Sequence, residues 1–345
     1  MKKLIPSLAI YCLILLGVEF AGRVYISISE KKNLTSNLTE LVMSLQEPFM
    51  GFGLKKNLET SMGSWSVTTN RLGFRGTEPT PAQRNIFVVG GSTVFGWGVP
   101  EKETIPFYMQ EIISKKHPEA KVFNMGIPWY SSSHEMALIL YRLIALKPTA
   151  IWVLDGLNDS AQAVAPSWKP NYLGYVDAAS ELLFQGEKSG FDKLLRLSQT
   201  FTYFRGKLHQ RKSIQTGVFH EEAAIQYAQY HSMVATVLKS KNIPYRVFFQ
   251  PVMSVHKPVT SFEDGHNGTS MKLPEFRNTF VKQYLALESA LSQNKTISSY
   301  SLKSIFEKES DTVYLDGLHY NAWGNKTIAQ KIIELQSDDI NSFFL

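Results

Sequence analysis

The sequence is poor in cysteine and in charge. Its 345 residues include one cysteine, Cys12, so neither an intrachain disulfide nor a cysteine-based metal site can form. Charged residues make up 19% of the chain and hydrophobic residues 44%, which excludes a mainly disordered, collagen-like or coiled-coil protein. Lysine and arginine number 36 against 30 acidic residues, with no dense basic tract, so no nucleic acid is predicted as a partner.

One long apolar run stands at the start of the chain. Leu4 to Ala21 follows Lys2 and Lys3, and its length suffices for a helix to span a hydrocarbon core of roughly 30 Å. No clear small-x-small cleavage site precedes the polar stretch. Residues 1–22 are therefore predicted to be an uncleaved signal anchor, in preference to a cleavable secretory signal. We therefore expect a single-pass membrane protein whose remaining domain is extracytoplasmic, in the periplasm or at the cell exterior.

The rest of the chain divides by its hydrophobic pattern. Residues 23–84 show no sustained periodicity and are predicted to form a stalk and lead-in segment. Over residues 85–340, short apolar runs alternate with amphipathic segments, which predicts βαβ units in a three-layer α/β/α, flavodoxin-like domain with a parallel sheet. The alternation breaks at about 160–218, which indicates an insertion. The expected strands are 86–89, 122–125, 150–154 and 245–250, and the expected helices are 105–116, 134–146, 221–241, 274–292 and 322–335, the last with Asn321 as its cap.

Polar residues after the expected strands and before the last expected helix supply the parts of a nucleophilic site. Ligands of open parallel sheets bind at the carboxyl ends of the strands, so these positions are the ones to inspect. Ser92 provides a hydroxyl, His319 a base that can take its proton, and Asp316 a carboxylate that can orient the imidazole. The spacing between Asp316 and His319 lets both come from one short loop.

Together with Gly126 and the run Gly156-x-Asn158-Asp159, these residues resemble the four sequence blocks of the SGNH (GDSL) hydrolase superfamily. The resemblance covers most of residues 85–335 and implies Ser92 as nucleophile with Asp316 and His319 completing the triad. It also implies an oxyanion hole made by the N–H groups of Ser92 and Gly126 and by the Asn158 amide. The lead-in Asn-Arg-Leu-Gly-Phe-Arg-Gly at 70–76 is similar to those of membrane-anchored bacterial members.

The chain departs from the family pattern at one position and lacks the rival motifs. Gly91 stands where the family has the aspartate of Gly-Asp-Ser, which bears on fine geometry more than on activity. A Gly-x-Ser-x-Gly elbow is absent because Val94 replaces its second glycine, and Trp97 stands where a P-loop needs lysine. Leu138 replaces the second histidine of a zinc-protease helix. No metal and no cofactor are implied.

The resemblance makes a serine esterase the leading hypothesis, with an ester-bearing substrate such as an O-acetylated or otherwise short-acylated cell-surface glycan. An O-acyltransferase using the same triad and a non-catalytic glycan- or partner-binding module remain open. Trp129 and Tyr130 are candidates to line the pocket, whereas Tyr320 and Trp323 are expected to pack in the core. A basic amphipathic helix within 191–212 fits either a membrane surface or ordinary packing.

Overall fold

The computed structural model describes residues 49–80, 84–171 and 217–344, together with the single residues 19, 22, 43, 44 and 47. Nearly all of the predicted anchor over 1–22 and most of the predicted insertion, including the amphipathic segment 191–212, lie outside these residues. Among the described residues, no helix combines the length and the apolar character needed to cross a bilayer. The anchor stays a prediction.

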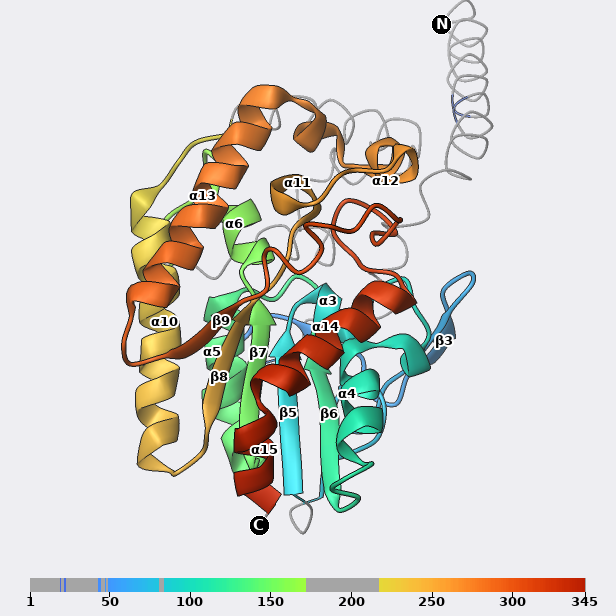
Figure 1. Cartoon of the computed structure of the whole chain (residues 1–345), viewed down its shortest axis with the longest axis vertical. Coiled ribbons are helices and arrows are strands. Elements are labelled where there is room, and N and C mark those ends of the chain that lie inside the picture. The colour runs from blue at the N-terminus through green and yellow to red at the C-terminus, as the bar shows by residue number, and fades with distance from the viewer. Residues whose placement is uncertain are drawn as a thin grey trace, which may run out of the picture. The chain divides into compact units, whose positions relative to one another are not determined.

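A five-stranded parallel sheet forms the centre of the described domain (Figure 1). Its register places Gly90 opposite both Gly126 and Leu154, so the carboxyl ends of three strands meet at one edge. The strand at residues 298–301 is polar and half-exposed, and its sequence did not predict it. In spatial order the strands are β6 (Ala120–Gly126), β5 (Arg84–Gly90), β7 (Ala150–Asp155), β8 (Tyr245–Phe249) and β9 (Ser298–Ser301).

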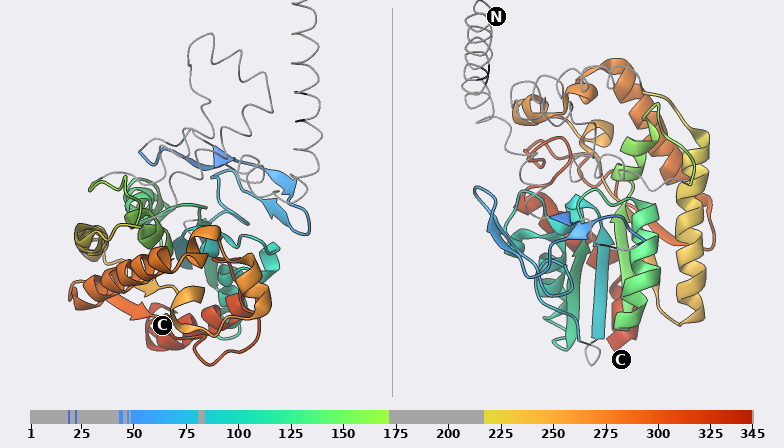
Figure 2. Two further views of the ribbon diagram at one scale, coloured as in Figure 1. Left: turned by 90° about the horizontal axis from the view of Figure 1, so that it is seen from above. Right: turned by 180° about the vertical axis from the view of Figure 1, so that it is seen from behind.

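Helices cover both faces of the sheet, as the alternating pattern predicted (Figures 1 and 2). Along β5, Ile86 and Val88 point to one core, where they pack with Ile328 and its neighbours. The central strands β5 and β7 are buried on both faces, which explains their continuous apolar runs. One layer holds α4 (Ile105–Ile113) and α14 (Ala322–Leu335), and the other holds α5 (Ser132–Leu138) and α10 (Glu221–Ser240), beside which lies α13 (Pro274–Gln293).

The expected helix starts are confirmed where a side chain can cap them. Asn321 Oδ1 accepts from the Gly324 N–H at 2.8 Å at the start of α14, and Thr104 caps α4 in the same way. The helix expected over 134–146 is not uniform, because it widens to a π-helix after Leu138 and ends in a 3₁₀ turn. Shorter helices are α3 (Ser92–Phe95), η1 (Glu101–Glu103), α6 (Leu157–Ala163), α11 (Met253–His256), α12 (Ser261–His266), η4 (Thr269–Lys272) and α15 (Ser337–Phe344).

The described part of the segment predicted as stalk and lead-in is not a stalk. Phe52 and Phe74 are fully buried, and Arg75 is only 2% exposed. The Arg75 guanidinium donates to the carbonyl oxygens of Phe95 and Gly96, both at 2.8 Å, which lie just after Ser92. Residues 49–80 are therefore part of the domain and support the segment that carries Ser92. Three short strands of this segment and one before it form two antiparallel pairs, β1 (Met43–Ser44) with β2 (Gly53–Leu54) and β3 (Glu59–Ser61) with β4 (Ser66–Thr68).

Candidate active site

Ser92 lies where β5 ends, as the first residue of the short helix α3. Helical backbone at this position has no intrahelical acceptor for its N–H. Two glycines make the approach possible. A Cβ on Gly90 would stand 2.5 Å from the Leu154 carbonyl oxygen, and a Cβ on Gly91 would stand 2.5 Å from Asn158 Nδ2. The sharp turn before Ser92 is therefore possible because Gly90 and Gly91 have no side chains.

The structure brings Ser92, His319 and Asp316 together. His319 Nε2 lies 2.7 Å from Ser92 Oγ, and His319 Nδ1 lies 2.8 Å from Asp316 Oδ2. Ser92 and His319 are 227 positions apart in sequence, and the resemblance to SGNH hydrolases implied that they meet. The two contacts form a continuous path from hydroxyl to imidazole to carboxylate, the arrangement that activates a serine.

Asp316 is fixed in its ionised form. Burial opposes ionisation, but the nearby His319 and hydrogen bonds from His319 and Leu318 outweigh it and lower the pKa of Asp316. Its Oδ1 accepts the backbone N–H groups of Leu318 and His319, both at 2.8 Å. The carboxylate that receives His319 Nδ1 is thus oriented by its own loop and can hold one tautomer of the imidazole.

A buried ion pair holds the loop from the other side. Glu263 of α12 is fully buried and bonds to Lys257 Nζ at 2.8 Å. Its Oε1 accepts the N–H groups of Val313 and Tyr314 at 2.9 and 3.0 Å, just before Asp316. Sequence reasoning missed this pair because neither residue belongs to a recognisable motif.

The oxyanion side of the site differs from the expectation at Gly126. Its N–H donates to Asn124 Oδ1 at 3.0 Å inside the buried end of β6, so it is not available to a ligand. Asn158, in contrast, lies at the start of α6 with its amide against Gly91. One amide hydrogen is used by the Tyr130 carbonyl oxygen at 2.7 Å, which leaves the second for a ligand. Gly126 stands at the end of β6 as expected, but its N–H is already bonded, whereas the Asn158 amide keeps a second hydrogen.

Some of the aromatic residues near the site are not placed as expected. Tyr130 is fully buried, and its hydroxyl donates to the Phe52 carbonyl oxygen at 2.6 Å, so it does not line a pocket. Tyr320 lies in the core as expected, whereas Trp323 is 47% exposed. Trp97 was noted in the sequence only because it stands where a P-loop would need lysine. In the structure its ring centroid lies 6.2 Å from that of His319.

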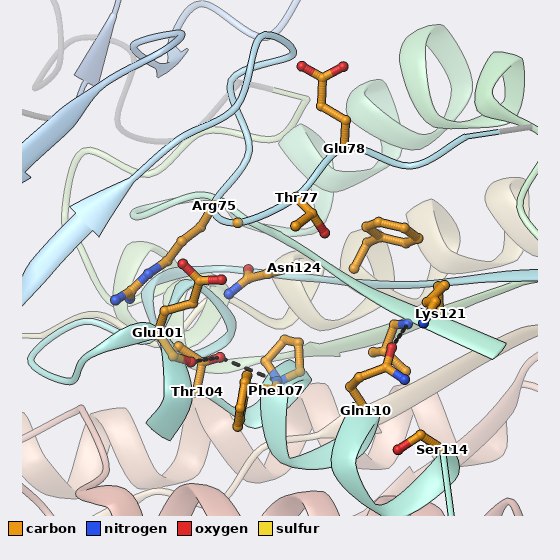
Figure 3. Close-up of a pocket in the computed structure, with 14 residues that line it drawn as sticks. Arg75, Thr77, Glu78, Glu101, Thr104, Phe107, Gln110, Ser114, Lys121 and Asn124 are labelled. Carbon is orange, nitrogen blue, oxygen red and sulfur yellow. Dashed lines mark hydrogen bonds between the residues drawn. The ribbon is translucent and has the colours of Figure 1, made fainter. Parts of the chain in front are cut away.

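A cavity of about 600 Å³ opens beside β6, apart from the triad (Figure 3). Arg75, Glu101 and Asn124 are among the residues that line it, and none of the three triad residues does. Among the described residues, no cluster of three or more histidine, cysteine or acidic side chains has a geometry that could hold a metal ion.

Comparisons with known proteins give weak similarity of overall shape. No protein-family model and no curated protein matches the chain. It resembles the acetyl xylan esterase AlAXEase at 13% identity over 73% of this chain and 98% of that one, with a TM-score of 0.43. It resembles a lipase/acylhydrolase from Enterococcus faecalis at 11% identity over 74% of this chain and 97% of that one, with a TM-score of 0.43. It resembles the esterase EstA from Pseudoalteromonas sp. at 10% identity over 75% of this chain and 100% of that one, with a TM-score of 0.42. Similarity at this level assigns no activity to the chain.

Proposed function

We propose that the protein is a serine esterase that hydrolyses short-chain, O-acetyl or similar, esters. The observation that carries the proposal is the unbroken contact path from Ser92 Oγ through His319 to Asp316, at 2.7 and 2.8 Å. The sequence blocks that resemble those of SGNH hydrolases also support it.

In the proposed reaction, Ser92 Oγ attacks the ester carbonyl carbon while His319 Nε2 takes the hydroxyl proton. The tetrahedral intermediate collapses, the bond to the alcohol oxygen breaks, and His319 returns the proton to the leaving alcohol. Water then attacks the acyl-enzyme with His319 as base, which releases the acid and restores Ser92. Asp316 stabilises the imidazolium form of His319 throughout.

The developing oxyanion is stabilised by the Ser92 N–H and the second amide hydrogen of Asn158. Gly126 has no part in this proposal because its N–H is bonded to Asn124. Donors fixed in advance cost no reorganisation during the reaction, and each is typically worth about 2.7–4 kcal/mol. The Tyr130 carbonyl oxygen fixes the Asn158 amide in this way.

The proposed substrates are acyl esters on cell-surface glycans, and the proposed setting is the extracytoplasmic face of a membrane that holds residues 1–22. Both rest on the sequence resemblance and on the apolar N-terminal run. A sugar hydroxyl in place of water would make the same triad an O-acyltransferase. Product analysis with an acylated donor and a glycan acceptor separates the two outcomes.

The test is hydrolysis of p-nitrophenyl acetate by the full-length protein in detergent, beside Ser92→Ala and Ser292→Ala. Ser292 is exposed on α13 and serves as the matched serine control. We expect Ser92→Ala to lose activity and fluorophosphonate labelling while Ser292→Ala retains both. A Ser92→Ala protein as active as the wild type would refute the nucleophile, and a folded wild type without labelling would favour a binding module.

A further inference from the structure

Adjacent residues of α6 hold the loop opposite Ser92 at two points. The Asn158 amide donates to the Tyr130 carbonyl oxygen at 2.7 Å. The two carboxylate oxygens of Asp159 lie 3.2 and 3.1 Å from the backbone N of Ser132, and one of them also accepts from the Ser132 hydroxyl. Ser132 is the first residue of α5, so Asp159 also binds the positive end of that helix.

These bonds bear directly on the oxyanion side. A Cβ on Gly91 would lie 2.5 Å from Asn158 Nδ2 and 3.2 Å from the Tyr130 carbonyl oxygen, so the backbone before Ser92, the amide and the loop are in contact. The position of the Asn158 amide therefore depends on residues 130–132, and Asp159 is the side chain that ties Ser132 to the same helix.

Behind Asp159 lies a buried cluster of ionisable groups from four elements. Asp155, 4% exposed, ends β7 and accepts from Tyr227 at 2.6 Å on one oxygen, while His231 Nε2 lies 3.1 Å from the other. His231 Nδ1 lies 2.8 Å from the Tyr245 hydroxyl of β8. Glu135 of α5 is 1% exposed, and its carboxyl group hydrogen-bonds to that of Asp155.

The surroundings of the cluster raise the pKa of two of its acids. Burial, together with Asp155 and Asp159, raises the pKa of Glu135 well above its usual range. Burial and Asp155 also raise the pKa of Asp159, to about 7, against hydrogen bonds from Ser132 and the influence of His231, which lower it. The other titratable side chains that face this region are Tyr227 and Tyr230 of α10 and Tyr245 of β8.

We propose that Asp159 is a positioning residue whose ionised carboxylate holds residues 130–132 against α6 and thereby fixes the Asn158 amide for catalysis. The proposal rests on the proposed esterase function. Protonation of Asp159 removes an acceptor that the Ser132 N–H and hydroxyl share, so the oxyanion donor is held less firmly. The buried cluster makes this happen near neutral pH instead of near pH 4.

The main test compares kcat for p-nitrophenyl acetate in wild type and Asp159→Asn from pH 5.5 to 8.5. The amide is neutral at every pH and imitates the protonated acid. At pH 8.5 we expect a kcat about 10- to 100-fold lower than wild type with little change in KM, because misplaced donors act on the transition state. At pH 5.5 only about 3% of Asp159 is ionised, so the ratio falls below about five-fold. A ratio that is the same at all pH values, or no loss at all, refutes the proposal.

Glu135→Gln is the matched control, because it replaces another buried acid of the same cluster by its amide. We expect kcat ratios near one across the pH range. A pH-dependent loss like that of Asp159→Asn would place the effect in the packing of the cluster and overturn the proposal.

Ser132→Ala is the second variant, useful if Asp159→Asn does not fold. It keeps the backbone N–H donor and removes only the hydroxyl that lowers the pKa of Asp159. The acid limb of kcat should therefore move to higher pH, and an unshifted limb refutes the role of Asp159. Ser92→Ala in the same assay separates the two proposals, since activity in that variant refutes the esterase itself.

Discussion

The buried pair of Lys257 and Glu263 gives the sharpest prediction about the loop that carries Asp316 and His319. Glu263 is fully buried and accepts four hydrogen bonds, from Lys257 Nζ at 2.8 Å and from three backbone N–H groups. Lys257→Met removes the only cation bonded to this carboxylate among the described residues. Removal of one partner from a buried pair typically costs about 3–5 kcal/mol, because the remaining charge is left uncompensated.

The cost can be measured by urea and thermal unfolding followed by tryptophan fluorescence. For a domain of this size, 1 kcal/mol corresponds to about 2–4 °C in Tm, so Lys257→Met should lower Tm by about 6–20 °C. Lys326→Met, at an exposed position of α14, is the control and should stay within about 0.5 kcal/mol of wild type. A loss below about 1 kcal/mol in Lys257→Met would refute the reasoning.

The double variant Lys257→Met/Glu263→Gln separates the charge from the hydrogen bonds. The glutamine side chain that it introduces would still offer its amide oxygen to Val313 and Tyr314 but would leave the Thr260 N–H without its acceptor. We expect the double variant to cost about 1–3 kcal/mol, less than Lys257→Met alone. Additive losses in the two single variants and the double would show that the pair is not coupled.

The same pair predicts a pH dependence of stability. Burial raises the pKa of Glu263, but hydrogen bonds from Lys257, Thr260, Val313 and Tyr314 outweigh it, so the pKa is lower than its usual 4.5. A carboxylate with a lowered pKa stabilises the fold above the unfolded value and loses this contribution as pH falls through the folded value. The free energy of unfolding should therefore drop below about pH 4.5 in wild type, and less steeply in the double variant.

Three further predictions concern the site and its support. Asn158→Ala should lower kcat about 10²- to 10³-fold with an unchanged unfolding curve, and a kcat within three-fold of wild type would exclude Asn158 as an oxyanion donor. Gly91→Ala should lower kcat because its Cβ would stand 2.5 Å from Asn158 Nδ2, and Asn158→Ala in the same chain should remove most of the additional loss. Arg75→Met removes the guanidinium hydrogen bonds to the carbonyl oxygens of Phe95, Gly96 and Val99 and should cost about 3 kcal/mol in the free energy of unfolding, which Arg75→Lys does not restore.

The sequence predicted the placement of residues that follow from strand order. Ser92 and Asn158 each stand just after a buried apolar run, so parallel pairing brings them to one edge whatever the details of the loops. Asn321 was recognisable as a helix cap because capping depends only on neighbouring residues. The triad was recognisable because its residues match the sequence blocks of SGNH hydrolases. These predictions depend on local rules, on the meeting of parallel strand ends at one edge, or on that resemblance.

Other features depend on contacts that no local pattern encodes. Gly126 was a reasonable donor by its place at a strand end, but the Asn124 side chain two residues earlier takes its N–H. Residues 49–80 lack a sustained periodicity because their strands are only two or three residues long, although Phe52, Phe74 and Arg75 are buried. The buried cluster of ionisable groups behind Asp159 is assembled from four elements, and no local sequence pattern shows that these groups come together.

The glycine at position 91, where the family pattern has aspartate, is required by the position of a second residue, Asn158. Sequence reasoning treated the missing aspartate as a loss of support for the site. In the structure, the space that a Cβ at position 91 would need is occupied by the Asn158 amide, which is held there by the Tyr130 carbonyl oxygen. Gly91→Asp should therefore displace Asn158 and lower kcat, although it restores the family sequence. A gain in kcat from Gly91→Asp would mean that the amide position described here is not the catalytic one.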